Sequence, residues 1–126
     1  MKTFIDSDIL ISHLKGDKKA GDLLRRLTSE GNELWIGALQ RLEVVFLMKA
    51  SEEKETRLFL AGFKTHPLTQ EIVDRGAALF RLWNSTNGTA INDAVLAATV
   101  ELTGGHIYTQ NVKNFPMPEI IKSKGW

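Results

Sequence analysis

FIDSDILI, residues 4–11, places two carboxylates, Asp6 and Asp8, inside an otherwise apolar run near the N-terminus. An ionised group close to a core is costly unless something pairs with it. Thr3–Ile5 is typical of a short buried strand, and Ile9–Leu14 is typical of the start of a helix. The sequence therefore predicts a strand that ends at a charge and is followed at once by a helix.

The composition is that of an ordinary globular protein, with 43% hydrophobic and 25% charged residues among 126. This length predicts a single domain over residues 1–126. Absence of cysteine excludes disulfides and thiolate chemistry and favours a cytoplasmic location. A formal net charge of +1 argues neither for nor against a polyanionic partner.

Nothing in the hydropathy pattern suggests a membrane protein. No apolar segment approaches the roughly 20 residues that a membrane span needs. Asp6 and Asp8 break the first apolar run almost at once, which argues against a signal peptide.

Strand and helix patterns alternate along the chain. Asn84–Thr89, NSTNGT, reads as the clearest loop, and Asn92 is expected to cap a small-residue helix over Asp93–Leu102. The strand candidates are Thr3–Ile5, Glu33–Gly37, Thr65–Leu68 and His106–Thr109. Alternation of this kind predicts an α/β three-layer sandwich, with a central, mostly parallel sheet of four to five strands and helices on both faces.

Four polar residues, far apart in the sequence, fall where a parallel sheet would bring them together. Asp6 follows the first strand and Asn111 follows the last. Glu43 lies early in the helix after the second strand, and Asp93 lies in the first turn of the helix before the last strand. Ligands of open parallel sheets bind beyond the carboxyl ends of the strands. Gathered carboxylates repel one another unless a cation neutralises them, and oxygen ligands without His or Cys favour Mg²⁺ or Mn²⁺.

Each acid also has a purely structural interpretation. An Asp after a strand is most often a helix cap or a turn residue, and Asp8 fits the role of cap for the following helix. Asp93 would be favoured at a helix N-terminus by the dipole alone. Glu43 is harder to explain in this way, because it interrupts the apolar run between Leu42 and Val44. Residue types and spacing leave both interpretations open.

The same positions resemble the motifs of the PIN-domain ribonucleases, particularly the VapC-like toxins of toxin–antitoxin modules. FIDSDILI is similar to the first motif with Asp6, and IGALQRLEVVF to the second with Glu43. INDAVLAAT resembles the third with Asp93, and IYTQNVKNFP the fourth with Asn111. The four segments run in order from Phe4 to about Pro116.

The resemblance implies a Mg²⁺- or Mn²⁺-dependent endoribonuclease of the PIN-like fold, acting on RNA as the toxin of a toxin–antitoxin pair. Asp6, Glu43 and Asp93 would bind the metal, and Asn111 would complete the catalytic set. The resemblance further implies a homodimer and a small antitoxin protein that blocks the acidic site with a basic side chain.

Two departures from the family pattern stand out. Asp8 occupies a position where Asn, Ser or Thr is commoner, which adds negative charge near the site. Asn111 is neutral where many relatives have Asp, which favours one tightly held ion and a second that arrives with substrate. Gln40 and Arg41 are assigned no role.

Other functional classes are weighed against the same residues. The alternative function is a catalytically silent PIN-like module that binds RNA or protein, with Asn111 in its favour and the three retained acids against it. A receiver domain would need an Asp that Thr65–Gln70 does not supply. A P-loop protein is excluded, because the chain has no Gly-rich loop ending in Gly-Lys-Ser/Thr.

Overall fold

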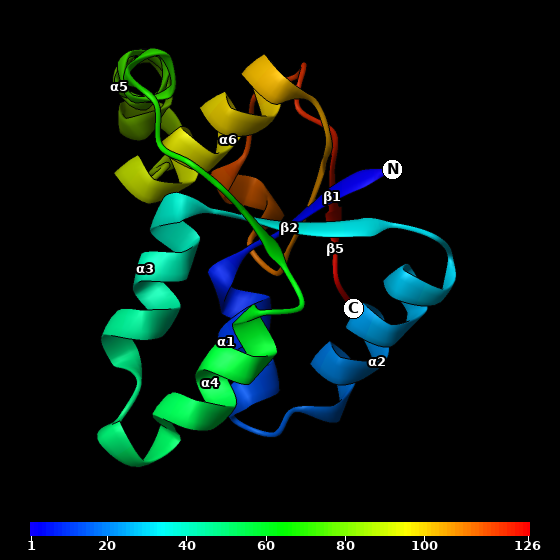
Figure 1. Ribbon diagram of the computed structural model, residues 1–126. Coiled ribbons are helices and arrows are strands. Elements are labelled where there is room, and N and C mark those ends of the chain that lie inside the picture. Colours follow the sequence, from blue (N-terminus) through cyan, green and yellow to red (C-terminus); the bar gives the residue numbers. More distant parts are fainter.

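A five-stranded sheet forms the centre of the computed structural model, which describes residues 1–126 (Figure 1). The strand order is β3-β2-β1-β4-β5, and every neighbouring pair is parallel. The strands are β1 (Lys2–Ile5), β2 (Glu33–Gly37), β3 (Lys64–His66), β4 (His106–Thr109) and β5 (Lys122–Lys124). The predicted α/β architecture with four to five strands is confirmed, and the sheet is parallel throughout.

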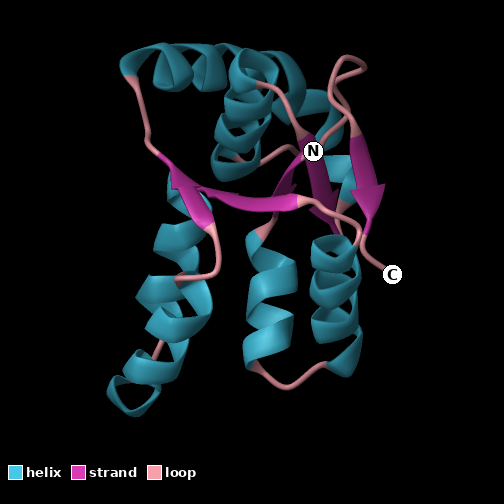
Figure 2. Cartoon of the chain, turned by 45° about the vertical axis from the view of Figure 1, so that its right-hand side comes forward, coloured by secondary structure: helices cyan, strands magenta, loops and turns pink.

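Helices cover both faces of the sheet, so the molecule has three layers (Figure 2). Four α-helices contribute side chains to the core on one face and two to the core on the other, with short 3₁₀ turns in the connections. The helices are α1 (Ser7–Leu14), α2 (Lys18–Ser29), α3 (Ala38–Leu47), η1 (Ala50–Glu52), α4 (Glu53–Leu60), α5 (Gln70–Asn87), α6 (Ile91–Thr103) and η2 (Val112–Asn114).

The two hydrophobic cores follow from the alternation of side chains along the central strand. Phe4 belongs to the core beneath α5 and α6, and the next residue, Ile5, belongs to the core beneath α1 to α4. Both side chains are fully buried. A parallel strand buried on both faces reads as a continuous apolar run, which is why Thr3–Ile5 was recognisable as a strand from the sequence.

Helix α6 is buried on almost every side. Its residues from Ala94 to Val100 are all buried, and α5 lies directly against it. The close approach depends on Gly76 of α5, because a Cβ added there would lie 2.8 Å from Val95 Cγ2 and 3.1 Å from Val95 Cα. Small side chains in α6 therefore serve helix packing and hold the start of this helix in place.

Two predicted boundaries between α5 and α6 are wrong. Asn84–Thr89 is not a loop throughout, because α5 continues to Asn87 and ends at Gly88, whose φ of +69° is left-handed. Asn92 does not cap α6. Ala90 takes that position with extended dihedral angles, and its carbonyl accepts a hydrogen bond from Ala94.

Strand β5 was not among the four strand candidates, because Lys122-Ser123-Lys124 carries no apolar pattern. It forms the edge of the sheet next to β4. Lysines on an edge strand discourage pairing with another chain, so the polar sequence suits the position.

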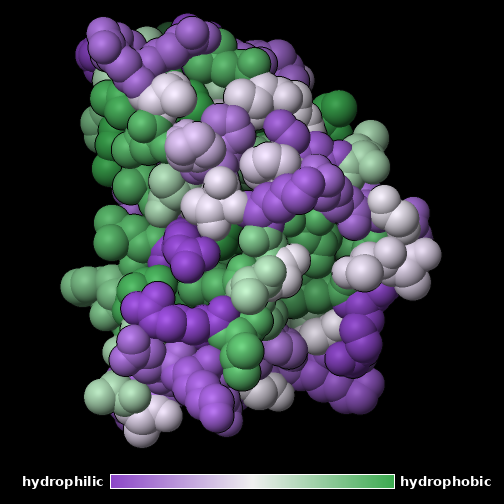
Figure 3. Space-filling view, viewed as in Figure 1, coloured by the Kyte–Doolittle hydropathy of each residue, from purple (hydrophilic) through white to green (hydrophobic).

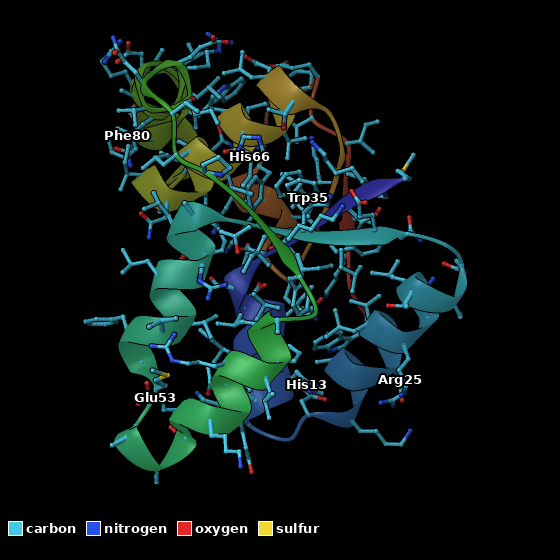
Figure 4. All side chains as sticks on the ribbon, viewed as in Figure 1. His13, Arg25, Trp35, Glu53, His66 and Phe80 are labelled. Carbon is cyan, nitrogen blue, oxygen red and sulfur yellow. The ribbon has the colours of Figure 1, made fainter.

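The aromatic and histidine side chains outside the two cores have structural neighbours (Figure 4). The centroid of the Trp35 ring lies 6.0 Å from that of Phe4 and 5.9 Å from that of His66. Lys2 Nζ lies over the Trp35 ring, 4.6 Å from its centroid. His13 of α1 stacks on Phe59 of α4 at 4.6 Å.

None of the helices combines the length and apolar character needed to span a bilayer.

Gly76→Ala should destabilise the protein by about 1–3 kcal/mol, because the new methyl group would collide with the backbone and side chain of Val95. Chemical denaturation followed by circular dichroism would measure the change. Gly62→Ala is the matched control, since its methyl group would meet only Phe59 O at 3.5 Å. Equal stability of the two variants would contradict the packing argument.

Candidate active site

Asp6 is fixed at the carboxyl end of the central strand by three elements. It is the N-cap residue of α1, and its Oδ1 accepts a hydrogen bond of 2.8 Å from the Ser7 N–H. Its Oδ2 accepts a bond of 2.8 Å from the hydroxyl of Thr109 at the end of β4. Its own N–H donates to Tyr108 O at 3.0 Å. The residue is only 5% exposed, so the carboxylate is both buried and held in place.

The four residues predicted from the sequence line one cavity of about 420 Å³. Asp6 enters it from the end of β1, Glu43 from α3, Asp93 from the first turn of α6, and Asn111 from the turn after β4. The remaining lining residues are Ser7, Asp8, Ile11, Ala90, Ile91, Asn92 and Asn114. Side chains from distant parts of the chain thus meet at one edge of the sheet.

No cation of the protein neutralises the cavity. The Lys and Arg ion pairs of the structure all lie elsewhere, on Asp22, Glu30, Glu33, Glu53 and Glu101. Four carboxylates therefore share one cavity with no positive partner from this chain. This arrangement carries a high electrostatic energy unless protons or a bound cation reduce the charge.

The concentration of negative charge raises the pKa values of two carboxyl groups in the cavity. Burial, followed by repulsion from Asp8 and Asp93, raises the pKa of Asp6 to about 7, against the opposing hydrogen bonds from Thr109 and Ser7. Burial, followed by repulsion from Glu43, raises the pKa of Asp93 to about 6, and a hydrogen bond from Asn114 opposes this shift. Both carboxyl groups consequently bind protons near neutrality when no cation is present.

Of the two interpretations left open for Asp8, helix cap and added charge near the site, the structure favours the second. Asp6 is the N-cap residue of α1, and Asp8 lies in the first turn. Its Oδ1 accepts from the N–H of Ile9, whereas its Oδ2 faces the turn after β4, where it accepts from Gln110 N at 2.9 Å and from Asn111 Nδ2 at 3.0 Å. The two-residue spacing from Asp6 was the only sequence signal for this contact.

Gln40, which had no role assigned from the sequence, connects the helices that carry Glu43 and Asp93. Its side chain is 1% exposed, and its Nε2 donates to Asn92 O at 3.4 Å. A Cβ at Gly37 would come within 2.2 Å of Gln40 Oε1, so glycine at the end of β2 leaves room for this side chain. Gln40 thereby links α3 to the start of α6.

Asn114 is a second lining residue that sequence reasoning did not single out. Its side chain faces the cavity and opposes the rise in the pKa of Asp93, and its carbonyl accepts a hydrogen bond of 3.1 Å from the buried hydroxyl of Thr89. The loop between α5 and α6 thus holds η2 against the cavity. The only sequence signal for the place of Asn114 at the cavity was that this residue belongs to the fourth motif.

The cavity fits a hard, hydrated divalent cation. Its donors are carboxylate and amide oxygens, with no His or Cys, which is the ligand chemistry of Mg²⁺ and Mn²⁺. No three His, Asp or Glu side chains are clustered tightly enough to hold an ion as they stand. Mg²⁺ usually keeps several waters and binds through one or two carboxylates, and the volume of about 420 Å³ has room for such an ion.

Comparison with known proteins agrees with the fold. Ribonuclease VapC10 of Mycobacterium tuberculosis is 34% identical to this chain over 119 residues, which are 94% of this chain and 89% of the relative. Ribonuclease VapC19 of the same organism is 31% identical over 114 residues, 90% of this chain and 91% of the relative.

Among solved structures, a toxin–antitoxin complex from Klebsiella pneumoniae contains a chain that superimposes with a TM-score of 0.80 and 24% identity, covering 98% of both chains. The sequence pattern of the PIN domain matches residues 3–114. This match covers nearly the whole sheet and every residue that lines the acidic cavity, and the chain belongs to the PIN-domain family.

Proposed function

We propose that this protein is a Mg²⁺- or Mn²⁺-dependent endoribonuclease and the toxin of a toxin–antitoxin pair. The observation that carries the proposal is the cavity in which Asp6, Asp8, Glu43 and Asp93 meet without a cation of the chain. Support comes from relatives of similar length named as ribonucleases. Metal-assisted hydrolysis of a phosphodiester is the chemistry that such an acidic oxygen site serves.

Asp6 and Asp93 are the proposed direct metal ligands, and Glu43 is proposed to bind through water or to orient the attacking water. When bound, the ion would activate water and stabilise negative charge on the phosphoryl oxygens. The chain's own contribution is position. Ser7 N–H and the Thr109 hydroxyl hold the Asp6 carboxylate, and Asn114 bonds Asp93.

The start of α6 offers a place for the phosphate. No side chain caps this helix, and Ala90, Ile91 and Asn92 at its first turn line the cavity. Unpaired N–H groups and the dipole at a helix N-terminus attract anions. The start of α1 differs, because Asp6 and Asp8 already accept hydrogen bonds from its N–H groups. We therefore assign phosphate binding to α6.

The proposed antitoxin would cover an apolar groove beside the cavity. This groove has a volume of about 260 Å³ and shares Ile11 with the acidic site. Its other lining residues are Leu14, Lys15, Val44, Leu47, Met48, Glu52, Glu55 and Thr56. An apolar segment in the groove could reach the carboxylates with an arginine, whose guanidinium suits an anionic pocket. A gene for a small protein directly upstream would support this partner.

Helix α3 provides the proposed homodimer surface. Leu42, Phe46 and Leu47 are 56%, 75% and 59% exposed. Apolar side chains gather along the edge of the molecule that α3 occupies (Figure 3). Several large apolar residues exposed on one helix mark an interaction site more often than a free surface. A second copy of the chain is the proposed occupant.

Purified protein should cleave a total RNA pool with Mn²⁺, and a chelator should abolish the cleavage. Asp6→Asn and Asp93→Ala should each lower the rate at least about a hundredfold, because Asp6→Asn replaces a charged ligand by a neutral one and Asp93→Ala removes a ligand. Every 1.4 kcal/mol of lost stabilisation is a factor of about ten in rate. Asp74→Asn is the matched control, since Asp74 is exposed on α5 and outside the cavity.

Wild-type rates in Asp93→Ala, or cleavage that a chelator does not affect, would contradict the assigned site. RNA binding without cleavage would favour the silent PIN-like module. Both outcomes are read from the same gel, provided that circular dichroism shows the variants to be folded.

In chelator, Asp6→Asn should be more stable than wild type at pH 8. The pKa of Asp6 is about 7 in the folded chain, against the ordinary value of 3.8 for an Asp exposed to water. Below pH 3.8 the carboxyl is protonated in both states, so the variant and wild type should differ little. As the pH rises from 3.8 to 7, wild type loses stability, by up to about 4 kcal/mol at 1.36 kcal/mol per pKa unit.

Urea denaturation at pH 4, 6 and 8 would measure the difference in the free energy of unfolding between Asp6→Asn and wild type. Added Mg²⁺ should narrow it at pH 8, because an ion that binds only the folded state stabilises wild type. A variant that is less stable than wild type at pH 8 in chelator would contradict the raised pKa.

Wild type should sediment as a dimer, and Phe46→Lys should sediment as a monomer because a charged side chain would be buried in the interface. Ile121→Lys is the control, since Ile121 is 60% exposed but lies beside β5, away from α3. Analytical ultracentrifugation at micromolar concentrations would distinguish the states. A monomeric wild type, or equal dissociation of both variants, would rule out this surface.

A further inference from the structure

Asp8 is the carboxylate of the cavity that accepts hydrogen bonds from both Gln110 and Asn111 of the fourth motif. Its Oδ2 accepts hydrogen bonds from Gln110 N at 2.9 Å and from Asn111 Nδ2 at 3.0 Å. The Thr109 hydroxyl, which donates its hydrogen to Asp6, lies 3.4 Å from the same oxygen. The two segments are more than 100 residues apart in the sequence. One oxygen of α1 therefore anchors the turn in which β4 ends.

This contact determines which atom Asn111 presents to the cavity. An ionised carboxylate can only accept hydrogen bonds, so the NH₂ group of Asn111 must face Asp8. The backbone N–H of Asn111 is also occupied, because it donates to Thr109 Oγ1 at 3.0 Å. The amide oxygen has no donor within the chain. It is the atom of Asn111 that remains free to meet a cation or a water.

The negative charge of Asp8 also reaches the proposed metal ligands. Repulsion from Asp8 contributes to the raised pKa of Asp6 and of Asp93. Asn111 supplies a free oxygen but no charge. Asp8 supplies a negative charge, but both of its carboxylate oxygens already accept hydrogen bonds. The two side chains together supply what a single aspartate in the fourth motif would supply.

We propose that Asp8 is a positioning residue that orients the Asn111 amide oxygen toward the cation and provides the fourth negative charge of the site. The proposal rests on the proposed function, because it assumes that a divalent cation occupies the cavity. Asp8 and Asn111 then form a carboxylate–amide pair whose members can be exchanged. Asn at position 8 and Asp at position 111 would keep one N–H···O bond and the same total charge, and would lose only the bond from Gln110 N–H, which an amide NH₂ group cannot accept.

The test is an exchange of the pair, with Asp8→Asn, Asn111→Asp and the double variant. Asp8→Asn should weaken Mn²⁺ binding at least tenfold in calorimetry, since a charge is lost and the amide is no longer held by a carboxylate. Asn111→Asp should lower the melting temperature of the metal-free protein at pH 8, because two carboxylates would replace a bonded pair. The double variant should recover both values, to within about threefold in affinity.

Asp17→Asn is the control for loss of charge alone. Asp17 caps α2 through a 2.9 Å bond to Lys19 N and does not line the cavity. This variant should bind Mn²⁺ as wild type does.

The outcomes separate this inference from the proposed function. The inference is wrong if Asp8→Asn binds Mn²⁺ like wild type, if the double variant is no better than the single ones, or if wild type binds no Mn²⁺. If Mn²⁺ affinity follows the predicted pattern but RNA is not cleaved, the nuclease proposal fails and the positioning role stands.

Discussion

The structure depends on a carboxylate buried at the carboxyl end of the central strand. Asp6 can occupy that place because Ser7 N–H and the Thr109 hydroxyl each bond one of its oxygens. These two bonds connect β1, α1 and β4. The strand order places β2 and β4 on opposite sides of β1, so connections leave the sheet in both directions at this point. Ligand sites of open α/β sheets form where the strand order reverses in this way. The acidic cavity is thus a result of the topology as much as of the individual residues.

Hydrogen bonds to the carboxylates offset part of the negative charge of the cavity. Asp8 accepts from the backbone and side chains of the turn after β4, and Asp93 bonds Asn114. The carboxylates also stay far enough apart that no three of them form a ready-made metal cluster. Proton uptake near neutrality removes more of the repulsion. In the proposed nuclease, such a site would reduce the stability of the protein in return for affinity for cations, which is the usual relation between function and stability at charged sites.

Much of this arrangement was predictable from the sequence, and the exceptions have physical reasons. Apolar runs ending in acids identified β1 and placed Asp6, and strand–helix alternation predicted the parallel sheet. The sequence left the role of Asp8 open between a helix cap and an added charge near the site. Its bond to Asn111 was not predictable, because it arises only when residues more than 100 positions apart meet. Strand β5 was missed because its pairing comes from β4 rather than from its own side chains.

The uncompensated charge also links inhibition to stability in the proposed toxin. A guanidinium in the cavity would neutralise the carboxylates that a metal ion would otherwise neutralise. A basic partner and the metal ion would therefore compete for the same site. Such a partner binds only the folded state and therefore stabilises the chain while it blocks the site. The apolar groove that shares Ile11 with the cavity would supply affinity independent of charge. A partner using both surfaces could displace a cation that each surface alone could not, since the two contributions combine in one binding event.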